Sequence, residues 1–177
     1  MVEEACQHES NTFGYGIWSH HIAPMVPIAR QLAQQCGADE EIVVIATLLH
    51  DLAGIQNADD VADHHTVGAV RAEEILHAHQ YPPERIRAVQ HCIRNHRGSV
   101  NNPKSTIEEI CVADADAVVH MTEIVSLFYV AYQEKGMSID DGKQWLKGKM
   151  QRDWEKMSEK SKRLFEHKYR AILDVLQ

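Results

Sequence analysis

The segment from Ile42 to Asp51 places the strongest constraint on how this chain can fold. Ile42 to Leu49 are apolar except for one threonine, and they run directly into His50 and Asp51. As a helix, this segment has no polar face before His50, so it must be buried all round. A charged aspartate beside a histidine at the end of a buried helix is costly unless a partner neutralises it. Imidazole and carboxylate are both good ligands for divalent metals, so the segment predicts a metal site.

The fold class predicted for the chain is all-α, with a bundle of six to eight helices. Apolar residues recur at helical spacing in successive windows, and no window alternates with period two between turn signals. Ser138 and either Ser105 or Thr106 are the expected helix caps, and a further helix is expected to begin at about Asp39. The length suits one domain, or one domain with an appended helical piece. We therefore expect a flexible arm over residues 1–14, a helical core over 15–125 and a C-terminal helical extension over 126–177.

The charge of the chain is unevenly distributed. The net charge of −8 argues against general affinity for nucleic acid. Residues 142–170, however, hold ten Lys or Arg and four Asp or Glu, so this segment is basic within an acidic protein. The simplest explanation is a solvated helical face. The alternative is a surface that contacts an anionic ligand or partner.

The cysteines and the apolar runs bear on where the protein works. The four cysteines are far apart and form no C-x-x-C pair, which fits a reducing compartment and neither a zinc ribbon nor a disulfide framework. The N-terminus is polar and has no apolar signal core, and no run approaches the ~18 apolar residues of a membrane span. We expect a cytoplasmic protein without a membrane partner.

The twelve histidines matter more for their positions than for their number. Each one taken singly is best explained as a surface or core histidine. Together with three aspartates, however, several of them fall on separate predicted helices, and such side chains meet in the core of helical bundles to form metal sites. The members of this set are His20, His21, His50, Asp51, His64, His65, His96, Asp114 and Asp116.

The order His21, His50-Asp51 and Asp116 resembles the HD-domain superfamily of metal-dependent phosphohydrolases. Five stretches resemble that pattern in order, over roughly residues 19–121, and the tail from about residue 125 lies outside it. These stretches are His21-Ile22 with the helix that follows, Ala46 to Asp51, Asp63-His64-His65 with the helix after it, Ile93 to His96, and Ala115-Asp116-Ala117.

The resemblance implies that His21, His50, Asp51 and Asp116 are the metal ligands. Asp114 is the alternative to Asp116. The two cannot be equivalent ligands, because side chains two residues apart on a helix diverge by about 200°. The alternative to a metal-binding role for Asp116 is an ordinary i, i+4 contact with His120 within one helix. His20 is the competitor for His21.

The resemblance also implies candidates for a second metal: His64 and His96, with His91 sometimes close by. Two metals sharing Asp51 would suit the hydrolysis of a phosphate ester. One metal, with His64 and His96 binding phosphate or transferring protons, is equally consistent with the sequence. Asp51, His64 and His96 are thus the catalytic candidates. Arg94 and Arg97 are candidates for binding the substrate phosphate.

The implied function is a metal-dependent phosphohydrolase that acts on a small phosphorylated metabolite, such as a nucleotide or another phosphomonoester or diester. Its cofactor would be one or two divalent ions, drawn from Mn, Fe, Co, Ni, Zn or Mg. Two alternatives remain: a non-catalytic regulatory module that binds metal or ligand, and a di-iron, oxygen-dependent enzyme on the same fold. A homodimer through the C-terminal helices is a further possibility, since Trp145 and Trp154 can pack on the core or on a second copy.

Overall fold

The structure is a computed structural model that describes residues 1–97 and 103–177, and every regular element in this part of the chain is helical. This confirms the all-α prediction. The elements are α1 (Val2–Gln7), η1 (Trp18–Ile22), α2 (Ala23–Cys36), α3 (Glu40–Leu49), α4 (Leu52–Gln56), η2 (Ala58–Asp60), α5 (His64–Ala78), α6 (Pro83–Asn95), α7 (Ile107–Thr122), α8 (Ile124–Tyr129), η3 (Val130–Glu134), α9 (Ile139–Lys156) and α10 (Glu159–Val175). Short helices such as α1, α4 and α8 take the number of segments beyond the six to eight expected.

Local signals set the helix ends. The Asp39 carboxylate accepts hydrogen bonds from the backbone N–H groups of Glu41 and Ile42 at the start of α3. Thr106 rather than Ser105 caps α7, and Ser138 caps α9 as expected. At Glu123 the backbone leaves the helical region, and this residue separates α7 from α8.

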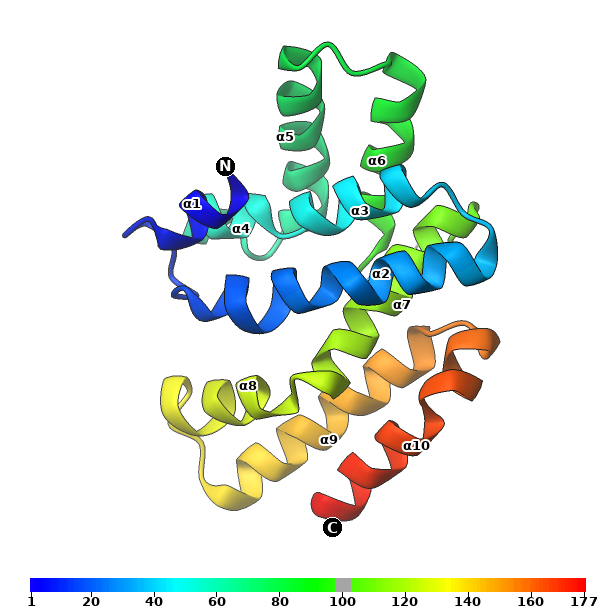
Figure 1. The fold of residues 1–177 in the computed structure, drawn as a ribbon. Helices are drawn as coiled ribbons and strands as arrows, with labels where there is room; N and C mark the ends of the chain where they lie inside the picture. Colours follow the sequence, from blue (N-terminus) through cyan, green and yellow to red (C-terminus); the bar gives the residue numbers. More distant parts are fainter. Residues whose placement is uncertain (98–102) are drawn as a thin grey trace.

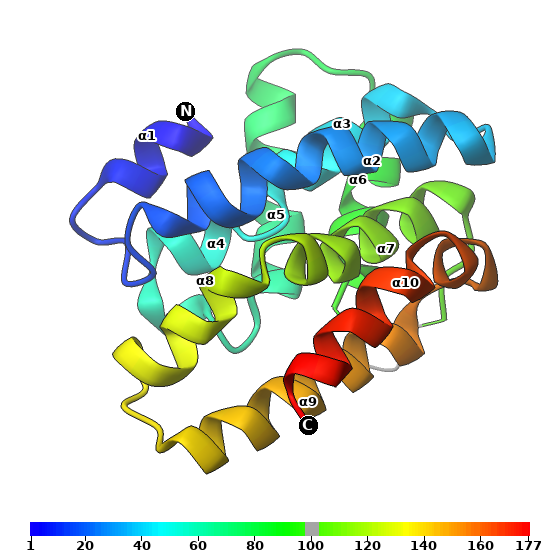
Figure 2. The same ribbon diagram turned by 60° about the horizontal axis from the view of Figure 1, so that its bottom comes forward.

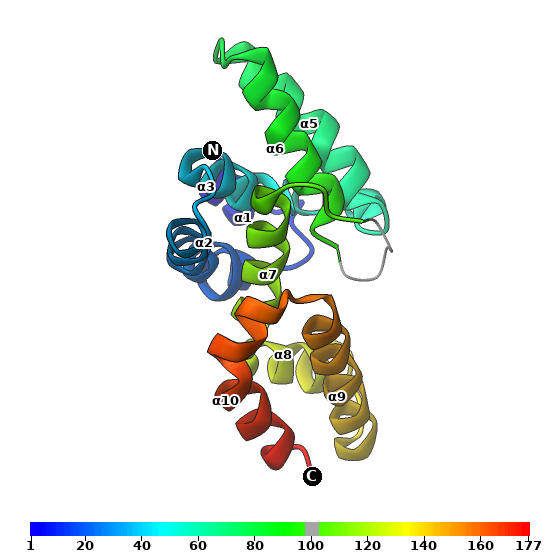
Figure 3. The same ribbon diagram turned by 90° about the vertical axis from the view of Figure 1, so that its right-hand side faces the viewer.

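The helices surround α7, which connects two packed regions (Figures 1 and 3). On one side, α2 and α3 pack on α7, and α5 and α6 form an antiparallel pair that projects from the molecule. On the other side lie α8, α9 and α10, with α9 and α10 contacting α7. The buried apolar residues accordingly form two clusters, one within residues 2–119 and one within residues 117–176. The division into core and extension at residue 125 nevertheless stays a prediction.

The N-terminal residues differ from the flexible arm expected for 1–14. Val2 to Gln7 form α1, which packs against α4 with Val2 and Cys6 buried. The sequence offers no periodicity here because the helix has less than two full turns, and it is stabilised by contacts with residues about fifty positions away.

The C-terminal tryptophans pack within the chain. Trp145 and Trp154 both lie against the second apolar cluster, and the Trp154 ring stacks on Tyr169 with a centroid separation of 4.3 Å. Both tryptophans thus pack within one chain, and the homodimer stays a prediction. Among the described residues, no helix is both long and apolar enough to cross a membrane.

Candidate metal centre

Five separate parts of the chain bring the predicted ligands to one place. His21 lies in η1, a π-helical turn that leads into α2, and such turns are frequent at functional sites. His50 and Asp51 occupy the break between α3 and α4, where Asp51 has φ −103° and ψ 0°. His64 is the first residue of α5, His96 directly follows α6, and Asp116 lies within α7. Most of these side chains thus sit at helix ends, where the chain changes direction.

The first group of ligand atoms surrounds one oxygen of Asp51. Oδ2 of Asp51 lies 3.2 Å from His50 Nε2 and 3.4 Å from His21 Nε2. The two imidazole nitrogens are 3.1 Å apart, and His21 Nε2 is also 3.4 Å from Oδ1 of Asp116. His50 is fully buried. His21, His50 and Asp51 are thus in mutual contact, and Asp116 joins them through His21 and through His50 Nε2, which lies 3.9 Å from its Oδ1.

The second group surrounds the other oxygen of Asp51. Oδ1 of Asp51 lies 3.3 Å from His64 Nε2 and 4.0 Å from His96 Nε2. The His64 and His96 Nε2 atoms are 3.2 Å apart. Asp51 thus faces one cluster of imidazoles with each of its two oxygens.

Backbone carbonyls orient three of these rings in the same way. Nδ1 of His50 lies 2.8 Å from the carbonyl oxygen of Thr47, that of His64 lies 2.9 Å from Val61, and that of His96 lies 2.6 Å from Ile93. A carbonyl oxygen can only accept a hydrogen bond, so each Nδ1 carries the proton. In the neutral rings, each Nε2 therefore presents a lone pair to the centre.

This donor set fits a divalent cation. Lone pairs of His64 and His96 that face each other beside a carboxylate oxygen repel one another unless a cation or a proton lies between them. Among the described residues, three groups bring their ligand atoms within 4.8 Å of one another: His21–His50–Asp51, Asp51–His64–His96 and His21–Asp116–His120. Imidazole nitrogen and carboxylate oxygen are the ligands that Mn, Fe, Co, Ni and Zn share.

The charges within the cluster compensate one another even without a metal. Burial disfavours a charged His50, but the carboxylates of Asp51 and Asp116 outweigh burial and raise the pKa of His50 to about 9. Burial and the neighbouring His50 lower the pKa of His96 to about 3. Burial also opposes the ionisation of Asp51, yet His50 and His21 keep its pKa well below the ordinary value. A bound cation would therefore replace the proton on His50.

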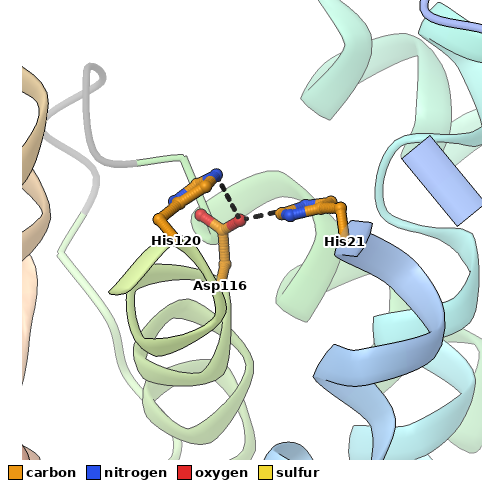
Figure 4. Close-up of side chains that lie close together, drawn as sticks. All are labelled: His21, Asp116 and His120. Atoms are coloured by element: carbon orange, nitrogen blue, oxygen red, sulfur yellow. Dashed lines mark ion pairs between the residues drawn. The ribbon is translucent and has the colours of Figure 1, made fainter. Parts of the chain in front are cut away.

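Asp116 lies on α7 between the side chains of His21 and His120 (Figure 4). Its Oδ1 faces His21 at 3.4 Å and His120 at 3.9 Å, and the rings of His21 and His120 stack with centroids 4.9 Å apart. Its Oδ2 accepts a hydrogen bond of 2.5 Å from Lys156 Nζ. Burial alone would raise the pKa of Asp116, but Lys156 and the two histidines keep it well below its usual value.

Four residues near the centre were not predicted as site residues: His120, Lys149, Asp153 and Lys156. His120 Nδ1 lies 3.1 Å from an Asp153 oxygen and 2.9 Å from Lys149 Nζ, and Lys149 also bonds both Asp153 oxygens. Asp153 and Lys156 are almost fully buried. The spacing of 149, 153 and 156 on one helical face, within the basic segment, is the sequence signal that could have identified them.

Several predicted residues do not join the cluster. The Asp114 carboxylate bonds the backbone N–H of Ser158 at 3.0 Å and its hydroxyl at 2.5 Å, so Asp114 supports the start of α10. His20 is mostly exposed, with Nδ1 3.7 Å from Glu123. His91 is also exposed and lies 3.8 Å from Glu109. Arg94 lies on the exposed side of α6 and does not line the cavity described next.

A cavity of about 310 Å³ opens over the cluster. Four cationic side chains line it beside the imidazoles and carboxylates: Arg97, Lys149, Arg152 and Lys156. Arg97, the second predicted phosphate-binding residue, also donates to the carbonyl oxygen of Ala62. The basic segment of the sequence therefore does more than cover a solvated face, because three of its cations line the cavity over the candidate metal centre.

Comparison with known proteins identifies the family and a structure of the same fold. The model of the HD domain family matches residues 18–121, a range that contains every ligand candidate discussed above. A crystal structure of a predicted HD superfamily hydrolase from an uncultured Thermotogales bacterium has the same fold, with a TM-score of 0.58 and 21% identity over 84% of this chain and 82% of that one. A search of curated proteins finds no significant match. Because the family model covers more than half of the chain, this protein belongs to the HD domain family.

Proposed function

We propose that the protein is a metal-dependent phosphohydrolase that acts on a small phosphorylated metabolite. The observation that carries the proposal is the position of Asp51, whose two oxygens face two separate imidazole clusters below a cavity lined by cations. The structural relative is described as a predicted hydrolase of the same superfamily, which supports this reaction class.

In this proposal, His21, His50, Asp51 and Asp116 hold one divalent metal, and Asp51, His64 and His96 hold a second. The carbonyl oxygens of Thr47, Val61 and Ile93 keep three of the rings in the ligating tautomer. Such ions lower the pKa of bound water towards ~7 and neutralise charge that develops on phosphoryl oxygens. We assign Asp51 the role of shared ligand rather than proton acceptor, because both of its oxygens face imidazoles.

The cations of the cavity are proposed to bind the phosphate group. Arg97 and Arg152 offer planar guanidinium groups, which pair well with phosphate oxygens. Lys149 adds positive charge at the same cavity. Arg94, on the exposed side of α6, is not included in this role.

The test is release of inorganic phosphate from a panel of nucleotides, phosphomonoesters and phosphodiesters, with each candidate metal in turn. We expect activity that a chelator abolishes, and that is lost in Asp51→Asn and His50→Ala while circular dichroism shows that both variants are folded. His167→Ala, on α10 outside the cluster, is the matched control. Bound metal without turnover of any substrate would refute the proposal in favour of a regulatory module, and consumption of oxygen would favour the di-iron alternative.

A further inference from the structure

A second and larger cavity, of about 730 Å³, also borders the candidate metal centre. His21, Asp51 and His120 line both cavities. A volume of this size is in the range of pockets that enclose a small organic ligand, ~300–1,000 Å³. A molecule bound at the centre can therefore extend into two different environments.

The walls of this second cavity come from two ends of the chain. Residues 12–17 form one wall, with Phe13, Tyr15 and Ile17 among them, and α8 with η3 forms the other. Figure 2 shows the N-terminal segment and α8 on the same side of the molecule. Apolar and aromatic side chains dominate: Val125 is 74% exposed and Tyr129 is 60% exposed, so their surfaces are open to a ligand.

The charges of the two cavities differ. The first has four Lys or Arg side chains, whereas the described residues that line the second include neither Lys nor Arg. Apart from Asp51, the charged residue in the second cavity is Glu134. An anionic group is thus favoured in the first cavity and disfavoured in the second, where an uncharged apolar group gains by leaving water.

The N-terminal wall is held in place before any ligand binds. Asn11 is buried, its Nδ2 donates to the carbonyl oxygens of Cys6 at 2.8 Å and Gly14 at 3.0 Å, and its Oδ1 accepts from the Phe13 N–H at 3.0 Å. Tyr15 donates from its hydroxyl to Glu3 of α1 at 2.9 Å. A wall that is already ordered costs less conformational entropy on binding.

We propose that the substrate is a phosphate ester whose phosphate group lies in the cation-lined cavity and whose ester oxygen carries an uncharged apolar group that fills the second cavity. That this phosphate ester is a substrate, and not only a ligand, rests on the proposed function. The walls that select the apolar group, residues 12–17 and 125–134, lie outside the range matched by the HD domain model, so this preference belongs to this chain's own segments.

Binding of non-hydrolysable phosphonates to the full-length, metal-loaded protein tests this inference by calorimetry. The probes are methylphosphonate, 2-naphthylmethylphosphonate and heptylphosphonate, which share the anionic group. We expect at least one of the two larger probes to bind about tenfold or more tightly than methylphosphonate, because it buries apolar area. The order of the two separates an aromatic from an alkyl preference.

The same substitution at two positions tests whether the second cavity causes the preference for the larger probe. Val125→Glu places a carboxylate in the second cavity, and Val175→Glu does so at a valine of the same 74% exposure on α10. We expect Val125→Glu to remove the preference for the larger probe, with methylphosphonate changed by less than about twofold, and Val175→Glu to have no effect. Tyr129→Ala should weaken the larger probe alone.

Equal affinity for all three probes overturns the inference, and so does a preference that Val125→Glu and Tyr129→Ala leave intact. These results are separate from the proposed function. Absence of phosphate release from every ester would refute hydrolysis, whereas the binding preference would still show whether the second cavity accepts an apolar group.

Discussion

Lys156 Nζ, from the last turn of α9, lies 2.5 Å from Oδ2 of Asp116, a predicted metal ligand in α7. Both side chains are nearly fully buried. The extension beyond the matched family range therefore supplies a charge partner to the candidate centre. Lys156 offsets the charge of Asp116 when no metal is present, and it orients the Asp116 carboxylate. It also adds positive charge to the cation-lined cavity.

Replacing Lys156 by methionine should destabilise the metal-free protein more than the metal-loaded protein. Removing one partner of a buried ion pair typically costs about 3–5 kcal/mol, because the remaining charge is unpaired. A bound metal would neutralise Asp116 and recover part of that loss. The measurement is the melting temperature with chelator and with added metal, and Lys160→Met, on an exposed lysine of α10, is the control. An equal metal-induced shift in wild type and Lys156→Met would contradict a shared role at Asp116.

The His64–His96 contact predicts the metal stoichiometry. The two Nε2 atoms lie 3.2 Å apart with Asp51 beside them, so we expect two metal ions per chain in the wild-type protein. His64→Ala or His96→Ala should reduce this to one while the His21–His50 group keeps its ion. Elemental analysis of the purified proteins measures it. The exposed His91 gives the control variant His91→Ala, which should keep both ions. One ion in the wild type would return His64 and His96 to phosphate binding or proton transfer.

Asp114 and Asp116 form a matched pair for testing the last ligand. Asp116→Asn should lower the affinity for metal by ten- to a hundredfold or more, by roughly the amount that weakened ligation costs. Asp114→Asn should leave metal content unchanged but lower stability by about 1 kcal/mol, because it weakens the bonds to Ser158 at the start of α10. Metal titration and thermal unfolding of both variants separate the two roles. Loss of metal in Asp114→Asn alone would reverse the assignment.

Arg152 lines the cation-lined cavity and is exposed, so its removal should act on binding more than on folding. We expect Arg152→Ala to raise KM for a phosphorylated substrate by about three- to tenfold with little change in kcat, since one charge-assisted contact is lost. Raising the ionic strength should reduce the difference between the variant and wild type. Arg163→Ala, exposed on α10 and outside the cavity, should behave as wild type. An unchanged KM in Arg152→Ala would place phosphate elsewhere.

We expect protonation of Glu109 to lower the stability of the protein in acid. Its buried carboxylate accepts bonds from Asn95 at 2.9 Å and from the N–H and hydroxyl of Ser105 at 3.0 and 2.9 Å. Burial alone raises the pKa of Glu109, but these bonds outweigh it and lower the pKa below the ordinary value of 4.5. The folded-state pKa is thus below that of the unfolded chain, so the stabilisation is complete above about pH 5 and is lost as the pH falls through the folded-state pKa.

The measurement for Glu109 is the melting temperature between about pH 6 and pH 3. Wild type should lose stability over this range more steeply than Glu109→Gln, which has no carboxylate to protonate and is less stable at neutral pH. The exposed Glu74 supplies the control Glu74→Gln, with a profile close to wild type. Parallel profiles for wild type and Glu109→Gln would show that Glu109 does not titrate in this way.

Local pattern was enough to predict the features that depend on neighbours in sequence. The apolar run from Ile42 to Leu49 predicted a buried helix ending at His50-Asp51, and α3 does end at Leu49. Thr106, offered as one of two caps, and Ser138 cap the helices that follow them. These outcomes are readable from sequence because helix caps and helical periodicity are set by residues within one or two turns of each other.

Tertiary structure alone decided which faces of distant helices meet. The family resemblance favoured Asp116 over Asp114, but the different contacts of the two carboxylates depend on how α7 is rotated against α9 and α10. From sequence alone, Lys149 and Lys156 are interpreted as part of a solvated helical face. In the structure α9 packs on α7, so that Lys149 contacts His120 and Lys156 contacts Asp116. In the same way, α1 exists through its contact with α4. Side-chain periodicity is local, whereas the mutual orientation of helices is set by packing between residues far apart in the chain.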